Sequence, residues 1–224
     1  YLWFFASVAL WNIANSVSIF YVFFAKEIGI SLDNFGKVVG LGSLLTMLVM
    51  YPIGSLVDRL RPLRVLLSSV FLVLPCSTFF IIGVHSGATF LIGWIAISVA
   101  CAGVAASLMP TYMAILPKDR FGQFCSAAAL VNAFCMVIAT PLAGRFLDMV
   151  GNKYRYVFVW QIVCIILAGL CLLKVYYGWR KLGGPGNYVA PAPNGQFKES
   201  ESHRERTITQ SLNVLGGNDD EILN

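Results

Sequence analysis

Residues 52–64 read Pro52-Ile-Gly54-Ser-Leu-Val-Asp58-Arg59-Leu-Arg61-Pro62-Leu-Arg64 and stand between two long apolar runs. Neither the run that ends within this segment, Val38 to Val57, nor the run that follows it, Val65 to Val84, contains a charged residue. Each run is long enough to cross roughly 30 Å of hydrocarbon at about 1.5 Å per helical residue. The segment between the runs therefore reads as a charged turn at a membrane surface that joins two membrane-spanning helices.

The composition of the whole chain agrees with this interpretation. Of the 224 residues, 58% are apolar and only 12% are charged, and the mean hydropathy is +0.73. These values are typical of integral membrane proteins and exclude a soluble globular domain. The formal net charge is +5, but the cations stand singly or in small groups at the ends of apolar runs. Lipid headgroups, and not nucleic acid, are therefore their expected partners.

Six apolar runs are long enough to span a bilayer, and we expect all six to be helices. Lipid offers no partner for an unpaired backbone amide, and the runs lack the alternation of a membrane barrel. The predicted fold class is an all-α membrane protein. The predicted spans are Tyr1–Ala25, Val38–Val57, Val65–Val84, Ala88–Leu116, Phe121–Gly144 and Tyr156–Tyr177.

The charges between the spans predict the orientation of the chain. Eight cations fall in the even-numbered loops and at the end of the last span, and five fall on the other side. The positive-inside rule places the side with eight cations, and with it the C-terminus, on the cytoplasmic side of the cell membrane or inner membrane. The eight are Arg59, Arg61, Arg64, Lys118, Arg120, Lys174, Arg180 and Lys181, and the five are Lys26, Lys37, Arg145, Lys153 and Arg155.

A change of composition divides the chain into a bundle, residues 1–181, and a tail, residues 182–224. The tail begins with Gly-Gly-Pro-Gly and Ala-Pro-Ala-Pro and continues with a charged, Ser-rich stretch. Such a composition cannot bury a core, so we expect a disordered cytoplasmic tail. The chain begins inside an apolar run and without methionine, so we expect a piece of a longer protein.

A short pattern recurs at the ends of two predicted spans. Gly54 and Asp58 close the second span, and Gly144 and Asp148 close the fifth, each pair with the spacing Gly-x-x-x-Asp. Because three spans separate the copies, they emerge on opposite faces of the membrane. The sequence thus predicts two inverted three-helix repeats. The alternative is a chance match between residue types that are common at the ends of membrane helices.

The first copy resembles the cytoplasmic loop signature of the major facilitator superfamily. The resemblance rests on Gly54, Asp58, Arg59 and Arg64, and it departs from the signature at Arg61, where the family prefers a second glycine. It implies a transporter of twelve helices in two six-helix halves. This chain resembles the second half, with the N-terminal half as its missing partner.

Further expectations accompany this resemblance. The stretch from Leu116 to Ala127 resembles a loop of sugar-transporter-like members, so a sugar is one candidate solute. A small residue at Gly54 would permit close helix contact, and the acid four residues later could face a helix N-terminus or an arginine. We expect Asp58 and Asp148 to act in gating, because both lie at the end of a span and not at mid-depth.

Neutral polar side chains are the predicted solute contacts, because the spans contain no charged residue or histidine at mid-depth. Asn12, Asn15 and Ser16 share one face of the first span at positions i, i+3 and i+4. Asn132 is the other amide at depth, and Trp94 offers an indole face to a sugar ring. Hydrogen bonding between helices for the amides, and lipid exposure for the indole, are the alternatives.

The predicted function is secondary active or facilitative transport of a small polar solute by alternating access. If transport is coupled to protons, as in a symporter, the titrating acid is expected in the missing half. The alternative class is a membrane scaffold that moves no solute. An enzyme is disfavoured because nucleotide-binding and metalloprotease motifs are lacking, and we expect no cofactor or metal. The six cysteines read as packing residues.

Overall fold

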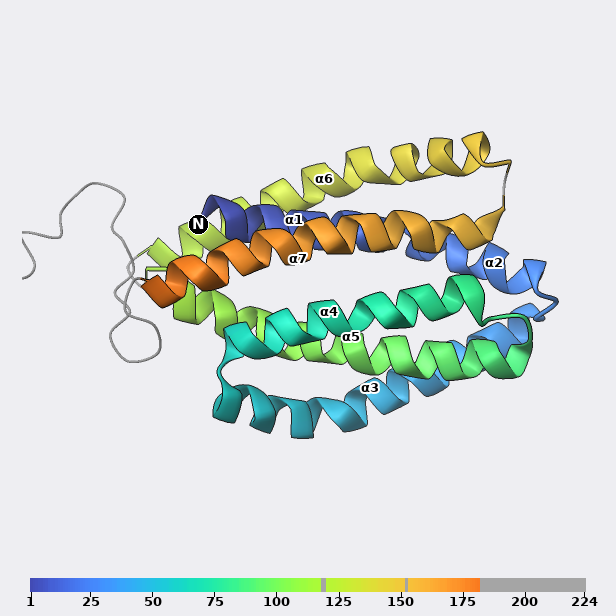
Figure 1. The fold of residues 1–224 in the computed structure, drawn as a ribbon, viewed down its shortest axis with the longest axis horizontal. Helices are drawn as coiled ribbons and strands as arrows, with labels where there is room; N and C mark the ends of the chain where they lie inside the picture. The colour runs from blue at the N-terminus through green and yellow to red at the C-terminus, as the bar shows by residue number, and fades with distance from the viewer. Residues whose placement is uncertain (118–119, 152, 182–224) are drawn as a thin grey trace, which may run out of the picture. The chain divides into compact units, whose positions relative to one another are not determined.

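The structure, a computed structural model, describes residues 1–117, 120–151 and 153–181. These residues are helical throughout, apart from short turns (Figure 1). The tail predicted for residues 182–224 lies outside the described residues. The helices are α1 (Leu2–Asn15), α2 (Tyr21–Glu27), α3 (Leu32–Leu60), α4 (Pro62–Ile82), α5 (Gly87–Ile115), α6 (Phe121–Met149) and α7 (Val157–Lys181), with the short 3₁₀ helices η1 (Ser16–Phe20) and η3 (Tyr154–Tyr156).

Six helical segments of the described chain are long and apolar enough to cross a membrane. They correspond one to one with the six predicted spans, so the all-α prediction is confirmed. Several helices are longer than the apolar runs. α3 begins six residues before Val38, where the Ser31 side chain accepts a hydrogen bond from the Asn34 amide and caps the helix. Hydropathy alone does not predict these extra helical turns, because a capped helix end with polar residues extends beyond the apolar core into the headgroup region.

The first span is not one regular helix. It passes from α1 through η1 into α2, so Asn15 ends the α-helix and Ser16 begins a tighter 3₁₀ segment. Serine and asparagine bond easily to nearby backbone carbonyls, and here Ser16 Oγ donates to the carbonyl of Ile13 at 2.7 Å. The sequence predicted a continuous helix at this point. The break rotates the residues after Ser16 relative to the helix face that carries Asn12.

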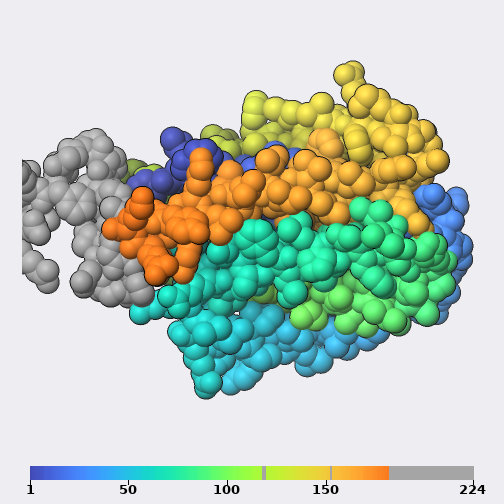
Figure 2. All heavy atoms as spheres, in the orientation of Figure 1, coloured from blue at the N-terminus to red at the C-terminus, as the bar shows by residue number. Residues whose placement is uncertain are grey.

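The packing of the helices has the symmetry of an inverted repeat. α4 packs mainly on α5, and α1 packs mainly on α7; α3 lies against α5, and α6 lies against α1. The two inner helices α4 and α7 lie side by side (Figures 1 and 2). Exchanging α1 with α5, α3 with α6 and α4 with α7 maps this set of contacts onto itself. Residues 1–181 thus contain two inverted three-helix repeats.

The two Gly-x-x-x-Asp copies lie at opposite ends of the bundle, as the repeat requires. Asp58 is at the end that holds the α3–α4 junction, the start of α6 and the last turn of α7, which we call the Asp58 end. Asp148 is at the end that holds the α2–α3 and α4–α5 turns and η3, which we call the Asp148 end (Figure 1).

The helices differ sharply in the fraction of their residues that is buried. In the most apolar window of α3, 6% of residues are buried, and in that of α6, 11%, against 39–44% in the other four spans. α3 and α6 are the two outermost helices of the packing order α6, α1, α7, α4, α5, α3 (Figure 1). They therefore present long apolar faces that the described helices do not cover.

Small residues permit close approach at some helix contacts and not at others. A Cβ added to Gly103 of α5 would collide with Ser69 of α4, and one added to Gly42 of α3 would collide with Trp94 of α5. By contrast, nothing in the described chain lies within 4 Å of a Cβ added to Gly36 or Gly40. The Gly-x-x-x-Gly pair of α3 therefore makes no helix contact inside this bundle.

Candidate functional site

A cavity of about 450 Å³ opens at the Asp58 end, and a second cavity of about 290 Å³ lies near the middle of the bundle. We call the second one the mid-bundle cavity. It is bounded by α3, α5, α7 and the first span, and Asn15, Thr46 and Cys101 each lie near the middle of their spans. Its wall consists of Asn15, Tyr21, Thr46, Trp94, Ile97, Ser98, Cys101, Ala102, Ala105 and Gln161.

A hydrogen-bond network fixes one wall of the mid-bundle cavity. The Tyr21 hydroxyl donates to Oε1 of Gln161 at 3.1 Å, and the Ser77 hydroxyl donates to the same oxygen at 3.4 Å. All three side chains are buried, and they come from α2, α4 and α7. Two hydroxyls from two other helices meet the Gln161 amide, so the fold fixes the position of this side chain.

Aromatic side chains form the part of the wall next to this network. Trp94 stacks on Phe90 with ring centroids 5.7 Å apart and meets the edge of Tyr21 at 5.8 Å. Tyr21 in turn stacks on Phe158 at 5.3 Å. These contacts continue into the aromatic core of the bundle. They hold Trp94 and Tyr21 in fixed positions beside the cavity, because aromatic contacts at these separations are favourable.

Two of the five predicted solute-contact residues, Asn15 and Trp94, lie on the mid-bundle cavity. The other polar residues of the first span are used locally: the Asn12 amide donates to the carbonyl of Val8 at 2.9 Å, and Ser16 is buried against Ile13. Asn15 also donates its amide to the carbonyl of Trp11, at 2.7 Å, which leaves its side-chain oxygen as an acceptor.

The fifth predicted residue, Asn132, does not line either cavity. It is half-buried on α6, and its side chain makes no hydrogen bond with residues 1–117, 120–151 or 153–181. Of the three amides Asn12, Asn15 and Asn132, only Asn15 lines the mid-bundle cavity. Solute contact by Asn12, Asn15 and Asn132 stays a prediction for the assembled protein.

Sequence reasoning missed the network that orders the cavity. Nothing in the sequence marks Tyr21, which lies near the end of the first span, and Gln161 is an isolated amide in the last span. Gln161 does bond a neighbour, as one expects of a lone amide in an apolar helix. The missing information is that the two residues meet, because 140 positions separate them.

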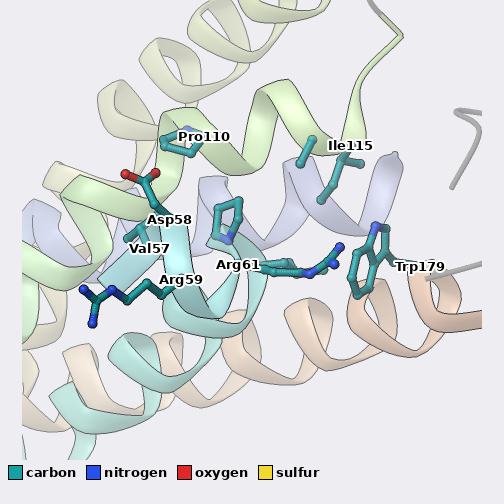
Figure 3. Close-up of a pocket in the computed structure, with 10 residues that line it drawn as sticks. Val57, Asp58, Arg59, Arg61, Pro110, Ile115 and Trp179 are labelled. Atoms are coloured by element: carbon teal, nitrogen blue, oxygen red, sulfur yellow. The ribbon is translucent and has the colours of Figure 1, made fainter. Parts of the chain in front are cut away.

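The cavity at the Asp58 end is charged as well as apolar. Figure 3 shows the Arg61 side chain extending toward Trp179 of α7, whereas the Asp58 carboxylate turns toward Pro110 of α5 and Arg59 points away. The Asp58 carboxylate makes no ion pair or hydrogen bond with the described part of the chain. The wall also contains Val57, Pro62, Leu63, Ala114 and Ile115.

Arg61, where the chain departs from the family signature, has an unusual backbone conformation. Arg61 has φ 75° and ψ 138°, and it ends α3 and begins α4 in one step. Non-glycine residues rarely adopt this conformation, whereas glycine adopts it at little cost. The turn thus has a conformation that suits glycine, although an arginine occupies it. Among the described residues other than glycine, Arg61 alone has a positive φ.

The remaining motif residues differ between the two copies. Nothing in the described chain lies within 4 Å of a Cβ added to Gly54, so the close helix contact expected there is not made within this bundle. In the second copy, a Cβ at Gly144 would touch Phe20 of η1 at 4.0 Å. Arg64 and Asp148 are exposed.

The described residues contain no group of three or more His, Cys, Asp or Glu side chains that could hold a metal ion. The six cysteines are free thiols, and Cys101 is on the wall of the mid-bundle cavity. The chemistry that this site offers is therefore hydrogen bonding and aromatic contact.

Comparisons with known proteins agree with this architecture. The sequence model of the Major Facilitator Superfamily matches residues 2–214. The human protein "Monocarboxylate transporter 6" is 30% identical to this chain over 92 residues, which are 41% of the chain and 18% of the human protein. The match thus covers less than a fifth of that relative. No solved structure gives a significant match.

Proposed function

The chain belongs to the major facilitator superfamily, and from this premise we propose that residues 1–181 are one six-helix half of an alternating-access transporter. Family membership makes the chain an integral, multi-pass membrane protein, and it supports transport of a solute rather than catalysis. The mechanism, the solute, the partner half and the orientation belong to the proposal.

The single observation that carries the proposal is the mid-bundle cavity. Its wall is mostly apolar but includes Asn15, Ser98 and Gln161, and it lies near the middle of the spans that form it. α3, one of the two least buried spans, contributes Thr46 to this wall. Polar groups at this depth have no use in a simple membrane anchor, because polar groups facing lipid cost free energy. A solute enclosed against a second bundle would satisfy these groups.

The second bundle is proposed to cover α3 and α6. These helices carry long exposed apolar faces, and α3 has Gly36 and Gly40 without a neighbour in this bundle. Small residues of this kind suit a sliding contact between bundles. The residues at mid-depth that await a partner include Asn132 on α6. In this arrangement Asp58 and Arg59 contact the other half in one state and lose the contact in the other.

The solute is proposed to be small and polar. A sugar fits the hydrogen-bonding and aromatic wall of the cavity, and the name of the human relative makes a monocarboxylate the second candidate. The described spans contain no cation at mid-depth. A carboxylate would therefore take its counter-charge from the other half, as would proton coupling, since both need an ionisable group inside the membrane.

The experiment is uptake of radiolabelled pyruvate and of glucose into vesicles that contain the whole protein as the cell makes it, with and without a proton gradient. Uptake of either probe above protein-free vesicles supports transport, and stimulation by the gradient supports a symporter. No uptake of either probe by correctly inserted protein contradicts this solute class and favours the membrane scaffold. Protease cleavage of residues 182–224 from the cytoplasmic side alone would support the orientation of the C-terminus and of the Asp58 end.

A further inference from the structure

Gly42 of α3 lies directly against the edge of the Trp94 indole. A Cβ added to Gly42 would stand 2.6 Å from Nε1 and 2.7 Å from Cδ1 of Trp94, and 3.0 Å from Oγ of Ser98. Non-bonded heavy atoms prefer separations of about 3.5–4.0 Å, so no side chain fits here unless α3 or the indole moves. Trp94 and Ser98 both line the mid-bundle cavity.

This glycine is the place where α3 is buried beside the cavity. Gly42 and Val57 are the buried residues of α3, and Val57 lies at the Asp58 end. One turn after Gly42, the Thr46 hydroxyl donates to the Gly42 carbonyl at 2.9 Å, and Thr46 is part of the cavity wall. A change at position 42 therefore acts on the packing of α3 against α5 at the border of the cavity.

Aromatic rings occupy other sides of the Trp94 indole. Phe90 stacks on it with ring centroids 5.7 Å apart, and Phe35 and Tyr21 meet it in T-shaped contacts at 5.9 and 5.8 Å. The mid-bundle cavity, by contrast, is open space that the indole borders. Packed rings resist displacement and a cavity does not. An indole displaced from Gly42 would therefore move into the cavity.

We propose that Gly42 is a positioning residue that sets the size of solute which the mid-bundle cavity admits. The absence of a side chain lets the Trp94 indole lie against the backbone of α3, and a larger residue would push the indole into the cavity. Gly42 acts through Trp94 and not through contact with the solute. This inference rests on the proposed transport function and adds a residue that controls solute size.

The test uses Cys101, a thiol on the wall of the same cavity. The whole protein in membrane vesicles is treated with methyl methanethiosulfonate or with benzyl methanethiosulfonate, two uncharged thiol reagents of different size. Mass spectrometry follows labelling of Cys101, with Cys101→Ala as the blank. The measured quantity is the size ratio, the labelling rate with the benzyl reagent divided by that with the methyl reagent. Cys135, a half-buried thiol of α6 that does not line this cavity, is the internal control.

The variants separate the size of the cavity from general damage to the bundle. Gly42→Ala should lower the size ratio at Cys101 by roughly tenfold, the rate equivalent of overpacking a site by one methyl group. The size ratio at Cys135 should not change. Adding Trp94→Leu should restore most of the ratio at Cys101, because leucine lacks the Nε1 atom that meets the new methyl group.

The matched control is Gly178→Ala, since nothing in the described chain lies within 4 Å of a Cβ at this helical glycine. It should leave the size ratio at Cys101 unchanged. If Gly42→Ala alone is not inserted in the membrane, insertion that is restored by Trp94→Leu supports the contact, and insertion that stays lost contradicts it.

Four results would overturn the inference: an unchanged size ratio in Gly42→Ala, equal slowing of both reagents at Cys101, no recovery with Trp94→Leu, or no labelling of Cys101 in the wild type. The uptake assay distinguishes this failure from failure of the proposed function. Uptake by a protein whose size ratio ignores Gly42→Ala leaves transport standing and removes Gly42 from the site. A size ratio that responds, without uptake of any probe, keeps the role of Gly42 in the cavity and removes transport.

Discussion

The guanidinium of Arg155 donates a hydrogen bond of 2.8 Å from Nη2 to the main-chain carbonyl of Val84, joining η3 to the α4–α5 turn. Its Nη1 donates to the carbonyl of Ile81 at 3.2 Å, so the cation lies at the C-terminal end of α4, where the helix dipole favours it. On the same 3₁₀ helix, the Tyr154 amide donates to Glu27 of α2 at 3.1 Å. These hydrogen bonds join η3 to α2, to the end of α4 and to the α4–α5 turn at the Asp148 end.

Removing this cation should destabilise the bundle. We expect Arg155→Leu to lower the free energy of unfolding by about 1.5–3 kcal/mol, the usual value for hydrogen bonds to a charged group. Arg155→Lys should recover only part of this loss, because an ammonium cannot reproduce the planar fork that reaches two carbonyls. Thermal unfolding in detergent measures both variants.

The control for this prediction is Lys153→Leu, since Lys153 is an exposed cation two residues away without a side-chain hydrogen bond to the described residues. Its effect should stay within about 0.5 kcal/mol. Equal destabilisation by the variants at 153 and 155 would show that charge at this end, and not the contact with Val84, is what matters.

The strained turn at Arg61 allows a comparison of two variants that lose the same side chain. Arg61→Gly and Arg61→Ala both remove the guanidinium, but only glycine relaxes at φ 75°. We expect the glycine variant to be more stable than the alanine variant by about 1 kcal/mol, even though glycine is the more flexible residue in the unfolded chain. Unfolding temperatures measured side by side test this order. An alanine variant as stable as the glycine variant would mean that the turn relaxes to a different backbone conformation.

The fold could be predicted from the sequence because its main determinants are local. A membrane span is recognised in the sequence by its length and apolarity. Asp58 and Asp148 mark the ends of two spans that are three spans apart, which implies that they lie on opposite faces of the membrane. The 3₁₀ segment at Ser16 escaped prediction, because the same residues also fit a regular helix and the choice depends on packing against α6 and α7.

The site was only half predictable, for a physical reason. Asn15 and Trp94 stand out as polar or aromatic residues at depth, and both lie on the mid-bundle cavity. Gln161 stands out equally, but its role depends on Tyr21 and Ser77, which approach it from two other helices. Neither partner can be identified from helix periodicity. Conversely, Asn12 looked like Asn15 in the sequence, and both amides donate to a backbone carbonyl four residues earlier, but only Asn15 lines the mid-bundle cavity.

The carboxylate of Asp58 should matter for transport and not for stability of this bundle. It lies on an open cavity and has no partner among the described residues, so Asp58→Asn should change the free energy of unfolding by less than about 0.5 kcal/mol. If the charge contacts the other half in one state, its loss should slow uptake roughly tenfold or more, the equivalent of one charge-assisted hydrogen bond.

Asp148→Asn is the comparison for this variant, because Asp148 holds the corresponding place in the second repeat and is also exposed. The two variants must be inserted in the membrane in equal amounts for their uptake rates to be compared. Full transport rates in Asp58→Asn would remove this carboxylate from the gating contact.

Close packing of α4 on α5 predicts opposite effects for the same substitution at two glycines. Gly103 is buried, and the Cβ of Gly103→Ala would meet Ser69, whose own Cβ cannot move aside without shifting α4. We expect a loss of about 1–3 kcal/mol in the free energy of unfolding.

Gly178 of α7 is the control, since nothing in the described chain lies within 4 Å of a Cβ there. Alanine favours a helix over glycine, so Gly178→Ala should be neutral or stabilising by up to about 1 kcal/mol. Thermal unfolding of both variants decides the matter: if Gly103→Ala is as stable as Gly178→Ala, α4 and α5 are further apart than their glycine contact requires.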